Sequence, residues 1–251
     1  MFKKAKHLIL ILPVCLGVSL GGRAADLVRP DWRGQDGATY QQWTFSNSAN
    51  PAAPEIINNS YGAAQAAVTV GHFGSGWLNQ LPGLGTMTGY WDVGGSGGRI
   101  VLDIDNKPHA SPKEIWVQVT YFKDITEAPA LQVPGAVYLR GQTLIVERVP
   151  TGGDWVLEQS VWKIEPSPSH ETIVLTSDPK WGSVIDQIVV DTYVRGCVVY
   201  FDDLSSFADQ WLDQGAGLQA DLDKDNDVDS RDYAEFGASW LKPCPTDWPW
   251  P

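Results

Sequence analysis

The feature that most constrains this chain is a twelve-residue run with aspartate at positions 1, 3, 5, 7, 9 and 12. Carboxylates packed this closely repel one another unless a cation lies between them. Calcium takes about six to eight oxygen ligands, and protein loops supply them at this spacing. We therefore expect the run to wind around one calcium ion, although a solvated acidic loop without metal is the alternative. The expected ligands are Asp221, Asp223, Asp225, Asp227 (through its carbonyl), Asp229 and Asp232.

An amphipathic helix is predicted directly after this run, because apolar residues recur there on one helical face. They are Tyr233, Phe236, Trp240 and Leu241, and Pro243 ends the pattern. The same pattern occurs 29 residues earlier, at Leu204, Phe207, Trp211 and Leu212. Short duplicated helices cannot bury their apolar faces alone, so we expect the two to pack on each other.

The duplicated loop-helix unit, over residues 199–245, resembles a type I dockerin module with its EF-hand-like calcium loops. The resemblance implies a small all-α pair of loop-helix repeats that docks onto a cohesin-like protein domain. The residues before Asp203 lack the aspartate series, so one calcium ion is expected rather than two. The family's recognition positions 10 and 11 fall on Phe201 and Asp202 in the first repeat and on Ser230 and Arg231 in the second.

The N-terminus has the pattern of a secretory signal peptide, over residues 1–24. Three lysines precede an apolar run at 8–20, and Gly22 and Ala24 provide small residues for cleavage. The run is short for a retained membrane helix, which is the alternative. Cleavage would remove four basic residues and no acidic one, taking the formal charge from −12 to −16. We therefore expect a secreted protein with no nucleic-acid partner and no membrane association after signal cleavage.

Two cysteines remain after such cleavage, and they lie on both sides of the helical repeats. In a secreted chain, Cys197 and Cys244 are expected to form a disulfide. Two free thiols are the alternative.

Residues 25–195 are predicted to form an antiparallel β-sandwich, because short alternating runs are separated by Gly, Pro, Asn and Ser. Residues 46–99 are expected to be long loops with one or two strands. The closing segment is similar to the last strands of jelly-roll domains in carbohydrate-binding and lectin-like proteins. Strands are expected over 99–104, 114–122, 143–149, 155–164, 172–176 and 184–194.

Most of the 12 tryptophans are expected to fill the core, where large aromatic side chains bury much area. Trp77 and Trp91 lie in glycine-rich surroundings and are the best candidates for a ligand-facing rim. An exposed aromatic face can stack on a sugar ring, which is the basis for predicting polysaccharide binding.

No catalytic arrangement stands out in the sequence. The expected organisation is a signal peptide (1–24), a β-sandwich (25–195), a dockerin-like module (196–245) and a tail (246–251). We expect a secreted non-catalytic protein with a calcium-binding docking module and a sandwich for polysaccharide. The alternatives are an extracellular polysaccharide hydrolase or lyase, or a purely structural surface protein.

Overall fold

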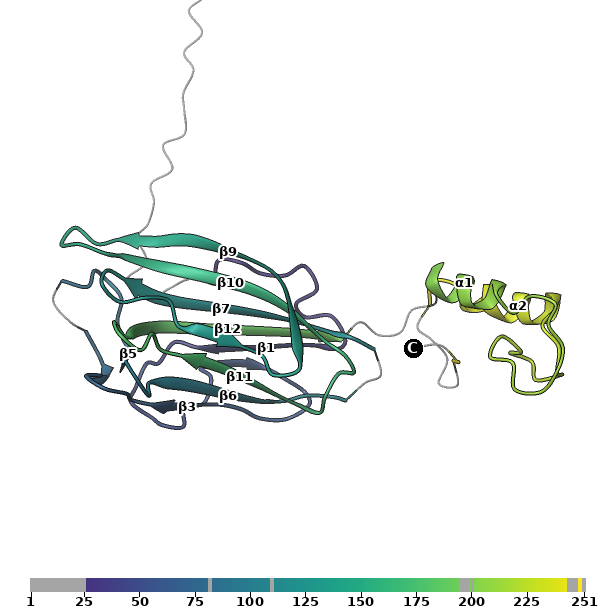
Figure 1. The fold of residues 1–251 in the computed structure, drawn as a ribbon, viewed down its shortest axis with the longest axis horizontal. Coiled ribbons are helices and arrows are strands. Elements are labelled where there is room, and N and C mark those ends of the chain that lie inside the picture. The colour runs from purple at the N-terminus through teal and green to yellow at the C-terminus, as the bar shows by residue number, and fades with distance from the viewer. Residues whose placement is uncertain are drawn as a thin grey trace, which may run out of the picture.

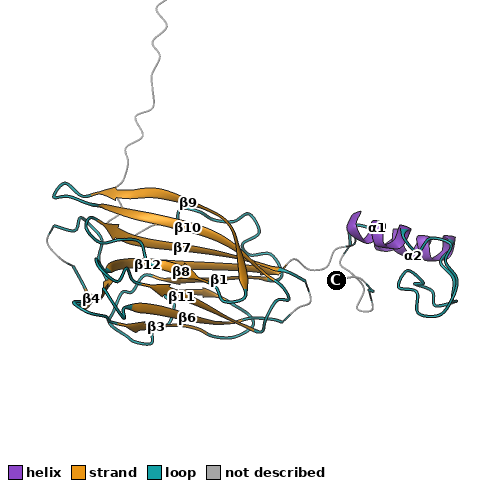
Figure 2. Cartoon of the chain, viewed as in Figure 1, coloured by secondary structure: helices purple, strands orange, loops and turns teal. Residues whose placement is uncertain are grey.

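The computed structural model describes residues 26–80, 83–108, 111–194, 199, 201–242 and 248–249. The predicted signal peptide, Cys197 and Cys244 lie outside the described residues. The chain is mainly β, with 44% strand and 8% helix, and its sheets are antiparallel. This confirms the predicted fold class at that level (Figure 2).

Twelve strands and two helices make up the described secondary structure. The strands are β1 (Ala38–Trp43), β2 (Ile56–Asn58), β3 (Ala64–Thr69), β4 (Gly76–Leu78), β5 (Tyr90–Gly94), β6 (Arg99–Asp105), β7 (Lys113–Lys123), β8 (Ala130–Gln132), β9 (Ala136–Arg148), β10 (Asp154–Ile164), β11 (His170–Thr176) and β12 (Ser183–Val194). The helices are α1 (Phe201–Ala208) and α2 (Ser230–Ser239).

The strands form two sheets. The larger has the order β2-β1-β12-β7-β10-β9, with β5 also paired to β12 and β4 paired to β5. The smaller has the order β3-β6-β11-β8. Every pairing between named strands is antiparallel, as in β12 with β7, where Val190 lies opposite Val117 (Figure 1).

The main core lies between the two sheets, which gives a β-sandwich-like architecture. Alternate residues of each strand point inward, because successive side chains of a strand face opposite sides. Ile100, Leu102 and Ile104 of β6 face the core from the smaller sheet, and Val117 of β7 and Val190 of β12 face it from the larger one. All five are fully buried, so the alternation in these predicted runs marks the buried face correctly.

The opposite face of the larger sheet is covered at two places. A second apolar cluster joins Phe122 and Trp155 to Met87 and Tyr90, which come from the segment around β5. Elsewhere on this face, the described segment 26–33 is held by Arg33, whose Nε donates to Asp191 Oδ1 at 2.5 Å. The same guanidinium donates to Asp26, so one arginine links the N-terminal segment to β12.

The buried carboxyl of Asp191 makes the stability of the β-domain depend on pH. Burial raises its pKa to about 6, although the hydrogen bonds and charge of Arg33 oppose the rise. An unfolded aspartate has a pKa of about 3.9, so between about pH 4 and 6 the folded chain holds this proton more tightly than the unfolded chain. The free energy of unfolding should therefore fall by up to about 3 kcal/mol as pH rises through this window.

Urea denaturation of the intact chain and of Asp191→Asn at several pH values checks this prediction. The variant has no proton to lose at this site, so its stability should fall less steeply between about pH 4 and 6. Equal slopes of unfolding free energy against pH for the two proteins would contradict the prediction. Absolute stabilities are not the readout, because the variant also leaves Arg33 with a neutral partner.

The expectation of one or two strands within residues 46–99 was wrong. The structure has β2, β3, β4 and β5 there, although two of these span three residues each. β1 was also not predicted, because its inward positions Thr39 and Gln41 are polar and buried. Polar inward residues and three-residue strands leave no alternating apolar pattern for sequence reasoning to detect.

The two C-terminal helices pack on each other through the predicted aromatic residues. Phe207 of α1 and Phe236 of α2 are buried, with ring centroids 5.2 Å apart. Val199, Ala220 and Val228 complete this small core. No helix among the described residues is long and apolar enough to span a membrane.

Candidate metal centre

The aspartate-rich loop is folded back on its own carboxylates. The backbone N–H groups of Asp225 and Asn226 donate to Asp221 Oδ1 and Oδ2 at 3.0 and 2.9 Å. Asn226, at position 6, has a φ of 73°, in the left-handed region that the turn requires. Asparagine tolerates this conformation better than most residues, which explains how the loop turns without glycine at this position.

Asp232 joins the two ends of the loop. Its carboxylate is fully buried and accepts from Leu222 N at 2.6 Å and from Asp223 N at 3.1 Å. It also accepts from Asp229 N at 2.8 Å, while the Asp229 carboxylate accepts from the backbone N–H groups of Arg231 and Asp232. This reciprocal capping box starts α2, so one carboxylate both closes the loop and fixes the helix start.

The six predicted ligands form two groups of three carboxylates. Asp221, Asp223 and Asp225 offer oxygen atoms within 4.8 Å of one another, and Asp227, Asp229 and Asp232 do the same. Desolvation, and then the charges of Asp225, Asp232 and Asp221, raise the pKa of Asp223. Desolvation and neighbouring carboxylates also raise the pKa of Asp227. The loop therefore concentrates negative charge that a cation would neutralise.

The chemistry of this donor set fits calcium. All six side chains offer hard oxygen ligands, the type that calcium prefers. Asp227 Oδ1 is also buried and has no hydrogen-bond partner in the structure. A buried polar atom without a partner is costly unless an ion or water satisfies it. The side chain of Asp227, for which only a carbonyl role was expected, therefore belongs to the candidate site.

The two loop-helix repeats are joined by reciprocal backbone hydrogen bonds. Leu212, after α1, donates to Val228 O in the second loop at 2.9 Å. Leu241, after α2, donates to Val199 O in the first repeat, also at 2.9 Å. Both leucines have positive φ, 68° and 55°. These pairs obey the same 29-residue offset that relates the sequence repeats, so the duplication is structural as well as sequential.

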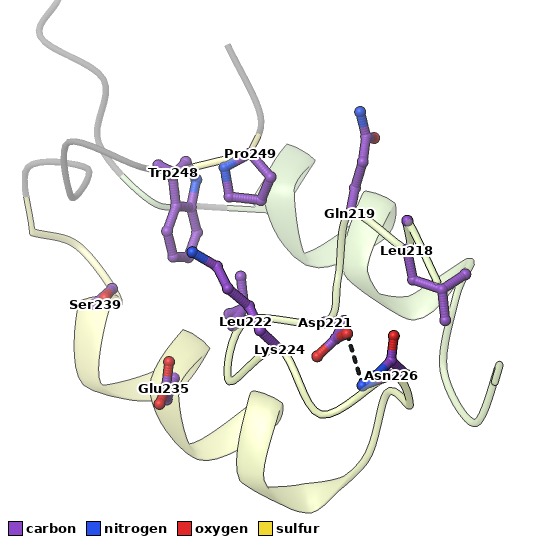
Figure 3. A pocket seen from close by; sticks show the side chains of 11 residues that line it. Leu218, Gln219, Asp221, Leu222, Lys224, Asn226, Glu235, Ser239, Trp248 and Pro249 are labelled. Atoms are coloured by element: carbon purple, nitrogen blue, oxygen red, sulfur yellow. Dashed lines mark hydrogen bonds between the residues drawn. The ribbon is translucent and has the colours of Figure 1, made fainter. Parts of the chain in front are cut away.

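Trp248, in the segment that was expected to be only a tail, packs against the helix pair. The Trp248 ring lies 5.7 Å from that of Phe236, and Trp248 Nε1 donates to Asp203 Oδ1 at 3.1 Å. A pocket of about 430 Å³ lies beside Trp248, and Figure 3 shows the residues that line it. Trp248 and Pro249 line one side of it, and Asp221 and Asn226 of the acidic loop line the other.

The predicted partner-docking residues lie at the first turns of the two helices. Phe201 begins α1 with 74% of its surface exposed, and its ring meets Trp240 edge-on at 5.3 Å. Ser230 and Arg231 begin α2 and are exposed, and the Arg231 guanidinium lies 3.5 Å from Asp225 Oδ2. Asp202 is in α1, but its side chain lies outside the described residues.

Of the two tryptophans predicted for a ligand-facing rim, Trp91 is buried and Trp77 is half-buried. Trp91 is 5% exposed and belongs to the main core, so the expectation for its side chain is wrong. Trp77 is half-buried against the same core, and its Nε1 donates to Phe45 O at 2.7 Å. Glycines surround both residues, but β4 and β5 pair there and turn the indoles inward.

The exposed aromatic side chains of this region are different ones, which sequence reasoning missed. Phe73 is 90% exposed and Trp181 is 48% exposed. The available signal was the Gly71-His-Phe-Gly74 sequence, in which glycines on both sides allow a tight turn with an aromatic residue at its tip.

Comparisons of the chain with protein-family models and with curated proteins found no match.

Proposed function

We propose that the C-terminal residues 199–245 form a dockerin-like module that binds one calcium ion through the loop Asp221 to Asp232. The observation that carries this proposal is the folded acidic loop, with six carboxylates in two close groups and a buried, unpartnered oxygen on Asp227. Calcium would supply the positive charge that these oxygens lack. The reciprocal contacts between the repeats support the likeness to a duplicated calcium-binding module.

The proposed role of the module is to dock a secreted, non-catalytic protein onto a cohesin-like partner domain. Phe201, Ser230 and Arg231 are exposed at the starts of the two helices and are available for such a contact. A disulfide between Cys197 and Cys244 would tie the two ends of the module together. We assign polysaccharide binding to the β-domain, for which the closing strands suggest a jelly-roll-like lineage.

Calcium titration of the intact chain, followed by isothermal calorimetry, tests the proposal. We expect one binding event per chain, because the residues before Asp203 lack the aspartate series. Asp209→Asn provides the matched control, since Asp209 is an exposed aspartate outside the loop, just after α1. Its titration should equal that of the intact chain. Absence of calcium binding, or two equivalent sites, would sink the proposal.

A further inference from the structure

Three loops at one end of the sandwich meet backbone against backbone. They are residues 71–75, before β4, residues 95–98, after β5, and residues 178–182, before β12; we call them the glycine rim. His72 donates its N–H to Ser96 O at 2.9 Å and accepts from Gly95 N at 2.8 Å. A Cβ added to Gly71 would lie 2.2 Å from Gly98 N, so the backbones of these two loops are too close for any residue other than glycine at position 71.

The third loop is joined to the same rim. A Cβ on Gly182 would lie 3.0 Å from the carbonyl carbon of Gly94, and one on Gly95 would lie 3.0 Å from Pro179 O. Asp178 also fixes the turn, because its Oδ1 accepts from Lys180 N and Trp181 N at 2.9 and 2.6 Å. Adjacent loops tied in this way hold their side chains in fixed positions.

The rim presents two exposed aromatic rings that lie outside the three apolar clusters, although the Phe73 ring lies 3.8 Å from that of His72. Phe73 has a φ of 64°, which is unusual for a bulky residue, and 90% of its surface is in water. An exposed ring in a strained conformation contributes nothing to the core, and such strain gathers at functional sites. Trp181 is half-exposed on the third loop, with the Lys180 ammonium 4.4 Å from its ring centroid.

The polar groups around these rings suit an uncharged, hydroxyl-rich ligand. His72, Ser75, Ser96 and Lys180 all expose hydrogen-bonding side chains on the same loops. The rim's one carboxylate, Asp178, already accepts backbone N–H groups. The chain as a whole is acidic, with a formal charge of −12, which disfavours an anionic polymer.

We propose that the glycine rim is the polysaccharide-binding site of the β-domain, with Phe73 and Trp181 stacking on the rings of a neutral glycan. This inference rests on the proposed function of the β-domain and gives it a location and a ligand class. A rim held by backbone contacts is already ordered before binding, so little conformational freedom is lost when the glycan arrives. The aromatic faces provide the apolar contact, and the surrounding hydroxyl, imidazole and ammonium groups bind sugar hydroxyls.

Affinity electrophoresis of the full chain tests the proposal, with hydroxyethyl cellulose, xylan, galactomannan and laminarin as probes. At least one of them should retard the intact chain. Phe73→Ala and Trp181→Ala should each weaken that binding by about tenfold, the loss expected for one aromatic stacking contact. Phe201→Ala and Trp211→Ala are matched controls, because they remove a Phe and a Trp of comparable exposure from the helical module.

Phe73→Gly separates a binding defect from a folding defect. Glycine adopts the left-handed conformation without strain, so this variant should melt at the same temperature as the intact chain or higher, yet bind about tenfold more weakly, like Phe73→Ala. If a probe binds but the rim variants bind it equally well, the rim assignment is wrong and glycan binding stands. If no probe binds, both fail. Retention on phosphatidylcholine vesicles that needs Phe73, without glycan binding, would identify a lipid site and overturn the proposal.

Discussion

Replacing Asp221 and Asp223 together with asparagine is expected to abolish calcium binding and, with it, the stabilisation of the module by calcium. With calcium at about 100 times its dissociation constant, binding to the folded state alone stabilises the intact module by about 2.7 kcal/mol. The variant lacks two carboxylates of the first group and should gain nothing. Asparagine at position 221 keeps one of the two oxygens that accept from Asp225 N and Asn226 N, so one of these two hydrogen bonds of the turn should remain.

The difference in melting temperature between the double variant and the intact chain should change sign when calcium is removed. Neighbouring carboxylates contribute to the raised pKa of Asp223, so the metal-free loop is destabilised by its own charge. Removing two charges relieves this repulsion, and the double variant should melt above the intact chain in excess chelator but below it in calcium. Scanning calorimetry of the helical transition in both buffers provides the measurement. If the melting temperature of the intact chain is the same in calcium and in excess chelator, this prediction is wrong.

Lys113→Ala is expected to cost the β-domain about 3–5 kcal/mol of unfolding free energy, because it leaves a buried carboxylate without its counter-charge. Lys113 begins β7 in the larger sheet, and its Nζ forms an ion pair with Glu171 of β11 in the smaller sheet. Both side chains are completely buried. Asn106 Nδ2 donates to the other carboxylate oxygen. Burial lowers the pKa of Lys113 and raises that of Glu171, so each charge depends on the other.

Two further variants isolate this effect in urea denaturation. Lys163→Ala breaks the exposed pair with Glu165 and should cost at most about 1 kcal/mol. The double variant Lys113→Met with Glu171→Leu removes both buried charges and should recover most of the stability lost in Lys113→Ala. Equal costs for Lys113→Ala and Lys163→Ala would contradict a buried, coupled pair.

Short-range sequence patterns predicted those features of the molecule that neighbouring residues determine. Alternation marked β6 because Ile100, Leu102 and Ile104 all face the core, and aspartate spacing marked the acidic loop before any fold was known. The ion pair between Lys113 and Glu171 could not be predicted, because its members are 58 residues apart and belong to different sheets.

The exposed position of Phe73 is likewise set by distant residues. Its loop is fixed by backbone contacts with residues 93–98, which no local window contains. For the same reason the glycine-rich surroundings of Trp91 were misleading, since they reflect close packing of loops and not exposure. Sequence reasoning therefore indicated this region, but Trp91, one of the two aromatic residues that it selected, is buried.

The crossed hydrogen bonds of Leu212 to Val228 and of Leu241 to Val199 make the two repeats one folding unit. Each repeat donates a backbone N–H to a carbonyl oxygen of the other, so neither repeat can form these hydrogen bonds alone. If a cation orders the second loop, the Leu212 to Val228 hydrogen bond would connect that order to the first repeat. A single ion bound there would then serve both halves, which agrees with the lack of an aspartate series before Asp203.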